Sequence, residues 1–292
     1  MAYFTFTDAS NETFVIRLDD PDLIAHARAL LAGTVTDEAR VGGIVTKAPA
    51  DYGIGWSYHL APDSIFFFDM STEVGDSTMR YIEDHLDEIG GHLLPGSVWT
   101  GWSSQLVDEL EVQEGQDRAD ILWGSSEADL LLGRGGRDLL GGGAGDDHLA
   151  AGRGQDVCIG GAGRDKLGGG AGDDLLYGGA GRDVLAGGRG DDRLGGGGGN
   201  DTFLIEATSR AGREVILDFA GGQGAGDVLR LDASWLEDLS DLTGDGKVTR
   251  GDLAAAFTVR GENLVLRHDA DSLIILKGAA GLTLHADDFS IG

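Results

Sequence analysis

The chain has 292 residues, with 50 acidic and 22 basic side chains and a formal charge of −28. Such an excess of negative charge argues against nucleic acids and anionic membrane surfaces as partners. Its one cysteine, Cys158, cannot form an internal disulfide, and no apolar run is long enough to cross a membrane. Residues 1–8 lack the basic and apolar regions of a cleavable signal peptide.

Residues 1–112 are predicted to form a compact α+β domain. Alternating apolar residues indicate strands at 3–7 and 13–18. A helix is expected to start at Pro21, with Asp20 as its N-cap, and to stop at Gly33. Further strands are predicted at 41–48, 56–60 and 65–70, and a second helix at 78–89.

Several stretches of this domain resemble a known family. Segments 14–18, 55–60 and 81–88, followed by Trp99 and Trp102, resemble the N-terminal domain of slime-mould calcium-regulated adhesion proteins and of bacterial secreted proteins, some linked to serine proteases. The resemblance implies a protein-recognition role, either adhesion or protease control. The cysteines that many relatives carry are missing here, which argues against a thiol-dependent role.

The same domain shows no catalytic motif. Its histidines, His26, His59, His85 and His92, form no H-E-x-x-H pair, and neither a G-x-S-x-G motif nor a cysteine nucleophile occurs. His85 lies among acidic residues of the predicted second helix, and we interpret that face as solvated rather than as a metal or acid–base site. We expect no enzymatic activity. The alternative is that residues 1–112 form an enzyme whose active site matches no recognised motif.

Residues 113–204 contain a nine-residue repeat. Every ninth residue from Asp120 is aspartate, and the second residue after each aspartate is apolar. The last eight units fit G-G-x-G-x-D-x-U-x, where U is apolar, apart from Arg134 and Ala151 in place of glycine. The aspartates are Asp120, Asp129, Asp138, Asp147, Asp156, Asp165, Asp174, Asp183, Asp192 and Asp201. The glycines two residues before them are Gly136, Gly145, Gly154, Gly163, Gly172, Gly181, Gly190 and Gly199.

This spacing predicts an all-β parallel β-roll, a solenoid in which two nonapeptides make one turn. Each short strand buries one apolar side chain against the next coil, and Cys158 is interpreted as one of these small buried groups. The turns present aspartate carboxylates and backbone carbonyls, including those expected from the glycines two residues before each aspartate, and these hard oxygen ligands suit Ca²⁺. Stacked carboxylates repel without a cation, so we expect about six to eight calcium ions to fold the roll.

The repeat resembles the calcium-binding nonapeptide of RTX secreted proteins. Residues 287–292, acidic and then apolar, resemble the uncleaved C-terminal export signal of RTX proteins that leave the cell by type I secretion machinery. The resemblance implies a secreted, extracellular protein whose roll folds on calcium after export.

Residues 205–292 are predicted to form a β-rich cap over the last coil, because that apolar layer would otherwise be exposed. Short strands are expected at 203–205, 214–219, 227–231, 264–266 and 273–276.

An EF-hand-like loop, similar to those of dockerins, is predicted at residues 241–252 within the cap. Its expected calcium ligands are Asp241, Thr243, Asp245, the carbonyl of Lys247, and Asp252. Aspartate in place of the usual glutamate at the last position implies weaker binding. The alternative is a polar turn leading into a helix at 253–257.

Three functions agree with these patterns. The first is a secreted calcium-binding protein whose N-terminal domain recognises a protein, as an adhesin or a protease inhibitor. The second is an enzyme with an unrecognised site in residues 1–112, and the third is a structural calcium-binding matrix protein.

Overall fold

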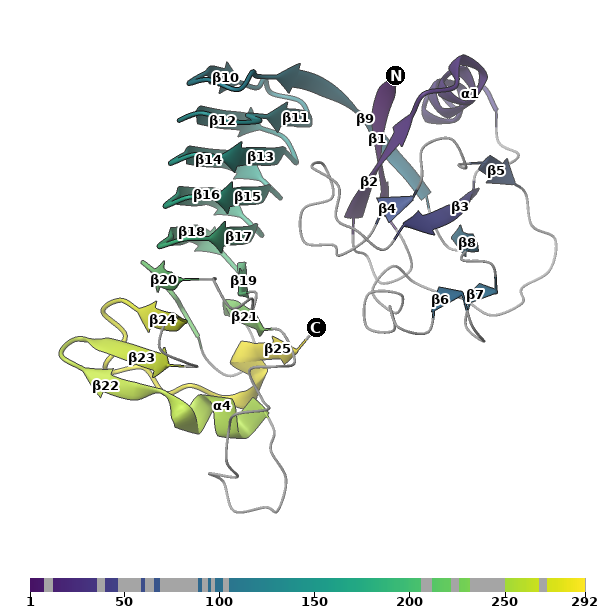
Figure 1. Ribbon diagram of the computed structural model, residues 1–292. Helices are drawn as coiled ribbons and strands as arrows, with labels where there is room; N and C mark the ends of the chain where they lie inside the picture. Colours follow the sequence, from purple (N-terminus) through teal and green to yellow (C-terminus); the bar gives the residue numbers. More distant parts are fainter. Residues whose placement is uncertain are drawn as a thin grey trace. The chain divides into compact units, whose positions relative to one another are not determined.

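A computed structural model describes residues 1–7, 13–35, 40–46, 59–60, 66–68, 89–90, 94–95, 98–101, 105–205, 212–221, 226–231, 250–267 and 272–291. It divides the chain into two compact units, Met1–Val112 and Gln113–Gly292. Figure 1 shows the helices and strands of each unit.

The N-terminal unit is built on a three-stranded antiparallel arrangement. Strand β1 (Ala2–Thr7) pairs with β2 (Thr13–Leu18) and with β9 (Gln105–Glu114). Phe4, Phe6, Ile16 and Leu18 are fully buried or nearly so and form its core. The predicted strands 3–7 and 13–18 are therefore confirmed.

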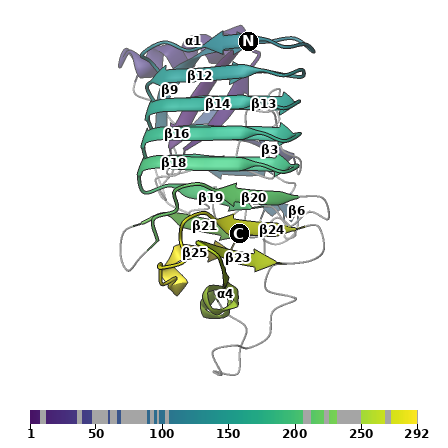
Figure 2. The same cartoon turned by 90° about the vertical axis from the view of Figure 1, so that its left-hand side faces the viewer.

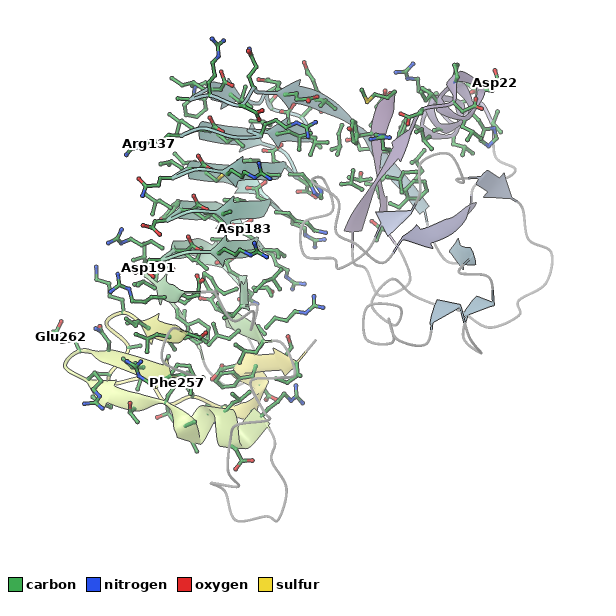
Figure 3. The ribbon with its side chains drawn as sticks, viewed as in Figure 1. Asp22, Arg137, Asp183, Asp191, Phe257 and Glu262 are labelled. Carbon is green, nitrogen blue, oxygen red and sulfur yellow. The ribbon has the colours of Figure 1, made fainter. Side chains whose placement is uncertain are left out.

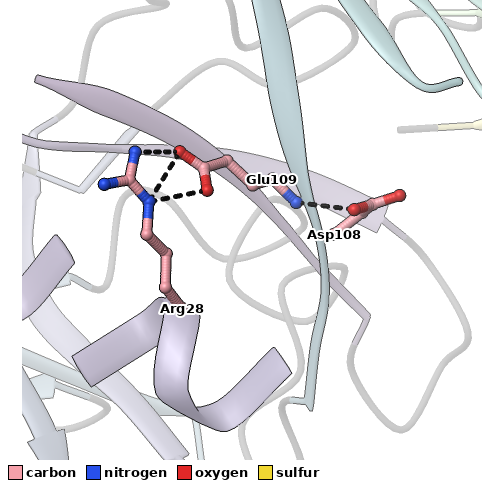
Figure 4. Close-up of polar contacts among 3 residues, drawn as sticks. All are labelled: Arg28, Asp108 and Glu109. Atoms are coloured by element: carbon pink, nitrogen blue, oxygen red, sulfur yellow. Dashed lines mark hydrogen bonds and ion pairs between the residues drawn. The ribbon is translucent and has the colours of Figure 1, made fainter. Parts of the chain in front are cut away.

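Helix α1 (Pro21–Leu31) begins where the sequence predicts. The carboxylate of Asp20 accepts hydrogen bonds from the amides of Asp22 and Leu23, which satisfies two of the free donors at the helix start. Arg28 in its last turn forms an ion pair with Glu109 of β9, with 2.6 Å between Nη2 and Oε1 (Figure 4). This contact joins the helix to the sheet within the unit.

The remaining described strands of this unit are short. Strand β3 (Arg40–Thr46) pairs antiparallel with β4 (His59–Leu60), β5 (Phe66–Phe68) and β8 (Val98–Gly101), and β6 (Ile89–Gly90) pairs with β7 (Leu94–Pro95). The described parts of the predicted strands 41–48, 56–60 and 65–70 are thus extended. Residues 78–88 of the predicted second helix lie outside the described residues. Its last residue, Ile89, is in a strand, so the prediction is wrong there.

Residues 111–216 form a β-solenoid of about six turns, whose strands stack one above another in two parallel sheets (Figures 1 and 2). Strand partners are 18 residues apart, as in Leu149 with Leu167 and Cys158 with Leu176. One sheet contains β11 (Asp129–Leu132), β13 (His148–Arg153), β15 (Lys166–Ala171), β17 (Val184–Arg189) and β19 (Thr202–Ile205). The other contains β10 (Ile121–Trp123), β12 (Leu139–Ala144), β14 (Val157–Gly163), β16 (Leu175–Gly181) and β18 (Arg193–Gly199). The predicted coil of two nonapeptides is confirmed.

The core of the roll is the predicted apolar column. The side chains two residues after each aspartate, from Leu131 to Phe203, have no exposed surface. Cys158 is one of them, and burial raises the pKa of its thiol well above the usual range. The thiol therefore stays protonated and acts as a small apolar group in the closed roll.

The C-terminal part continues both sheets of the roll. Strands β20 (Arg213–Ile216) and β24 (Leu273–Leu276) follow β18, and β21 (Val228–Leu231) and β25 (Phe289–Ile291) follow β19, all in parallel register. Antiparallel β23 (Asn263–Arg267) and β22 (Thr258–Arg260) close one sheet. Helix α4 (Arg250–Ala256) and the 3-10 turn η3 (Ala286–Asp288) complete the cap, which shares one hydrophobic core with the coils.

Candidate calcium sites

The ten repeat aspartates lie in two ladders, one on each edge of the roll. The first ladder is Asp120, Asp138, Asp156, Asp174 and Asp192, and the second is Asp129, Asp147, Asp165, Asp183 and Asp201. Within each ladder the backbone amide of one aspartate donates to Oδ1 of the aspartate in the next coil, at 2.7–2.9 Å. Figure 3 shows Asp183 among the stacked coils.

The second oxygen of these carboxylates has no partner. From Asp138 to Asp201, each Oδ2 is buried without a hydrogen bond among the described residues, and the same holds for Oδ1 of Asp129. A buried carboxylate oxygen without a partner is costly in free energy, so it indicates a group that the protein atoms do not supply. One such oxygen recurs in every nonapeptide repeat from Asp129 to Asp201.

From Asp138 to Asp201, with the exception of Asp156, a glycine stands beside the free oxygen. A Cβ added to Gly178 would lie 2.5 Å from Oδ2 of Asp183 and 2.7 Å from the carbonyl oxygen of Gly196 in the next coil. At Gly133 the corresponding distances are 2.7 Å to Asp138 and 2.5 Å to the carbonyl of Ala151. Both distances are too short for a real side chain, so glycine is what lets the free carboxylate oxygen and the carbonyl of the next coil lie close together. Carboxylate and carbonyl oxygens are the hard ligands that calcium prefers, so the residues present fit calcium.

The eight glycines two residues before the aspartates form the turns that carry these oxygens. Their φ angles lie between 108° and 152°, a region that other residues rarely adopt. A side chain at Gly172 would also overlap the carbonyl of Gly154 in the neighbouring coil. These glycines therefore allow neighbouring coils to stack closely.

Electrostatics also favour a bound cation. Burial, opposed by the amide hydrogen bond and reinforced by neighbouring carboxylates, raises the pKa of Asp147, Asp165 and Asp174 to about 7. The same causes raise the pKa of Asp183 and Asp192 to about 6. Among the described residues no three acidic, histidine or cysteine side chains cluster as a metal site, so an ion must take backbone carbonyls as well.

Two ladder residues are missing from the sequence prediction. Asp227 continues the second ladder, because the amide of Asp201 donates to its Oδ1 at 3.0 Å. Glu214 follows the first ladder, because the pairing of Arg193 with Val215 puts it in register with Asp192. Each is an acidic residue two positions before a buried apolar one, but insertions of the cap break the nine-residue period.

Most of the predicted EF-hand-like loop lies outside the described residues. Asp241, Thr243, Asp245 and Lys247 lie outside the described residues. Asp252 is described and is buried in the first turn of α4, which begins at Arg250. The helix expected after the loop is present, while calcium binding by the loop stays a prediction.

Comparison with protein-family models matches residues 1–113 to the BP-74 N-terminal domain. Residues 114–149, 142–167 and 168–203 match the RTX calcium-binding nonapeptide repeat. The chain carries RTX repeats behind a BP-74 N-terminal domain. Both resemblances found in the sequence are confirmed, and the RTX roll is a calcium-binding element.

Solved structures contain similar regions. The crystal structure of extracellular lipase LipA from Serratia marcescens matches with 19% identity and a TM-score of 0.31, over 61% of this chain and 39% of the lipase. The AlgE6R3 subunit of the Azotobacter vinelandii mannuronan C5-epimerase matches with 26% identity and a TM-score of 0.20, over 60% of this chain and 80% of the subunit. The matched region thus spans about two fifths of the lipase. None of the curated proteins compared with the chain matches it.

No helix among the described residues is long and apolar enough to cross a bilayer.

Proposed function

We propose that this chain is a secreted RTX protein, exported by type I machinery, whose roll folds on calcium outside the cell and carries a protein-recognition domain at its N-terminus. The observation that supports it is the pair of ladders, in which every repeat aspartate from Asp129 to Asp201 has one unpartnered buried carboxylate oxygen. The RTX repeats and the similarity to an extracellular lipase favour export.

Calcium would couple folding to location. Where free calcium is low, repulsion between the stacked carboxylates and the entropy of the glycine-rich coils oppose folding. In millimolar calcium, binding to the folded roll alone stabilises it by mass action. The chain would then be threadable inside the cell and compact outside it.

A calcium titration of the full chain tests the folding part of this proposal. Circular dichroism should show a gain of strand signal between sub-millimolar and millimolar calcium, reversed by EDTA. Magnesium is the matched control, because it demands a smaller octahedral site than these loops provide. A strand signal that is complete in EDTA would contradict the proposal.

Export has a separate test. Co-expression with a type I exporter should move the protein into the medium, and deletion of residues 287–292 should leave it in the cells. Equal export of both chains would argue against a signal in this segment.

For the N-terminal domain the proposed role is adhesion or protease control, supported by its match to the BP-74 N-terminal domain. The full chain and a chain lacking residues 1–112 should be compared in calcium for cell-surface binding and for inhibition of serine proteases. Loss of either activity with the domain supports recognition. Turnover of a substrate by the full chain alone would favour an enzyme, and no difference would favour a matrix protein.

A further inference from the structure

The first ladder does not end at its last repeat aspartate. Glu214 takes the next position, since β20 continues the sheet below β18 with Leu194 paired to Ile216. One coil further, the position of Glu214 is occupied by Ile274, which is fully buried. The ladder of carboxylates therefore stops at Glu214.

The hydrogen bonding changes at this last step. In each earlier step the amide of one aspartate donates to the next carboxylate, but the amide of Asp192 donates to the carbonyl of Arg213 at 3.0 Å. No backbone amide of the described residues donates to the Glu214 carboxylate. Its Oε2 is buried without a partner, as is Oδ2 of Asp192. Glu214 and Asp192 thus each keep one buried carboxylate oxygen available to a ligand.

The free oxygen keeps its place beside a glycine at this step. An added Cβ would lie 2.4 Å from Oδ2 of Asp192 at Gly187, as it would lie 2.5 Å from Oδ2 of Asp183 at Gly178. The last coil of the first ladder therefore presents its free aspartate oxygen as the regular coils do.

Asp192 and Glu214 also meet each other directly. Glu214 is 3% exposed and Asp192 is 0% exposed, and their carboxyl groups lie within hydrogen-bonding reach. Burial first, and then the carboxylates of Asp192 and Asp191, raise the pKa of Glu214. The basic neighbour, Arg213, pairs instead with the exposed Asp191, with 3.3 Å between Nη2 and Oδ2. Asp191 lies at the edge of the roll (Figure 3).

We propose that Asp192 and Glu214 hold a calcium ion at the end of the first ladder, with Glu214 as a two-oxygen ligand. This site lies beyond the nonapeptide consensus and rests on the proposed calcium-binding function. Glutamate reaches further than aspartate and binds calcium through both oxygens in EF-hands. The ion would fasten the cap strand β20 to the last regular coil.

The test counts the calcium ions bound to the full chain by native mass spectrometry. Glu214→Gln keeps the size of the side chain and removes its charge, and it should bind one ion fewer than the unchanged chain. Glu262→Gln, at an exposed glutamate of the cap shown in Figure 3, is the control and should bind the same number. An unchanged count in Glu214→Gln means that Glu214 is a buried protonated acid, and overturns the proposal.

A second variant decides the matter if Glu214→Gln fails to fold. Glu214→Asp keeps the charge on a shorter side chain, so its melting temperature should approach that of the unchanged chain as calcium rises. An equal deficit at all calcium concentrations would overturn the proposal. If the unchanged chain binds no calcium at all, the proposed function itself fails, which is a distinct outcome.

Discussion

The two ladders of the roll share one register but differ in the residues around them. In the second ladder a glycine stands five residues before each aspartate in every coil, at 124, 142, 160, 178 and 196. In the first ladder that position is Ala151 in the coil of Asp156. The other departure from the repeat, Arg134, also lies in the first ladder, in the coil of Asp138.

These departures have local physical consequences. The pairs Ala150–Gly168 and Gly152–Gly170 place Ala151 where Gly142 and Gly160 stand in the other ladder. Its methyl group therefore occupies the space that elsewhere lies between a free aspartate oxygen and the next carbonyl. We expect the site at Asp156 to be the weakest of the roll, and the second ladder to bind calcium more evenly.

Complete removal of calcium should abolish the difference between the ladders. The free carboxylates of both repel without a cation, so EDTA should unfold residues 113–292 as a whole. The loss of strand signal in circular dichroism and of protection in amide hydrogen exchange would show it. Protection that survives in one ladder would mean that this ladder folds without ions.

Acid should affect both ladders alike. Without calcium, the pKa of Asp174 in the first ladder and of Asp147 and Asp165 in the second is about 7, against an ordinary 3.8. The folded roll then binds more protons than the unfolded chain between these values, so its stability is greatest below 3.8 and is lost as the pH rises through 7. Circular dichroism in EDTA should show more strand at pH 4 than at pH 8. The opposite order would contradict this reading.

A reciprocal pair of substitutions should exchange the properties of the two ladders. Gly160→Ala puts a methyl group beside Asp165 and should remove one ion, which at saturating calcium costs about 3 kcal/mol. Ala151→Gly should add or tighten one ion at Asp156. Calcium counts and chemical unfolding measure both, and Ala186→Gly, on a strand of the roll, controls for added backbone freedom. Equal numbers of bound calcium ions in all variants would contradict this prediction.

The smallest effect is expected at Arg134. It is the one residue other than glycine with a positive φ among those described, at 76°, a conformation that costs about 1–2 kcal/mol. Its exposed ion pair with Glu114, 2.6 Å between Nη2 and Oε1, is worth about 0–1 kcal/mol. Arg134→Gly should therefore change the unfolding free energy by less than about 2 kcal/mol, and Arg134→Asn, which tolerates this backbone, serves as the control. A larger loss would show that the side chain has a further structural role.

The sequence predicts the regular part of the roll because its period and its buried positions coincide. It does not predict that Glu214 and Asp227 continue the ladders. They follow Asp192 and Asp201 by 22 and 26 residues, so the nine-residue period no longer shows which residues lie in register. The sequence also does not predict that one oxygen of each carboxylate accepts a hydrogen bond from a backbone amide, because this contact depends on the geometry of the backbone. Residues 287–292 are interpreted as an export signal, and the described part of this segment also belongs to η3 and β25 of the cap, because Phe289 pairs with Leu229.

Cys158 makes one coil observable by simple chemistry. The only thiol of the chain lies in the apolar column of the Asp156 coil, seven residues after Ala151, and has no exposed surface. A thiol reagent can reach it only when that coil separates from its neighbours. The rate of thiol labelling therefore measures how often this coil opens, and it is the coil that we expect calcium to hold most weakly. No engineered label is needed.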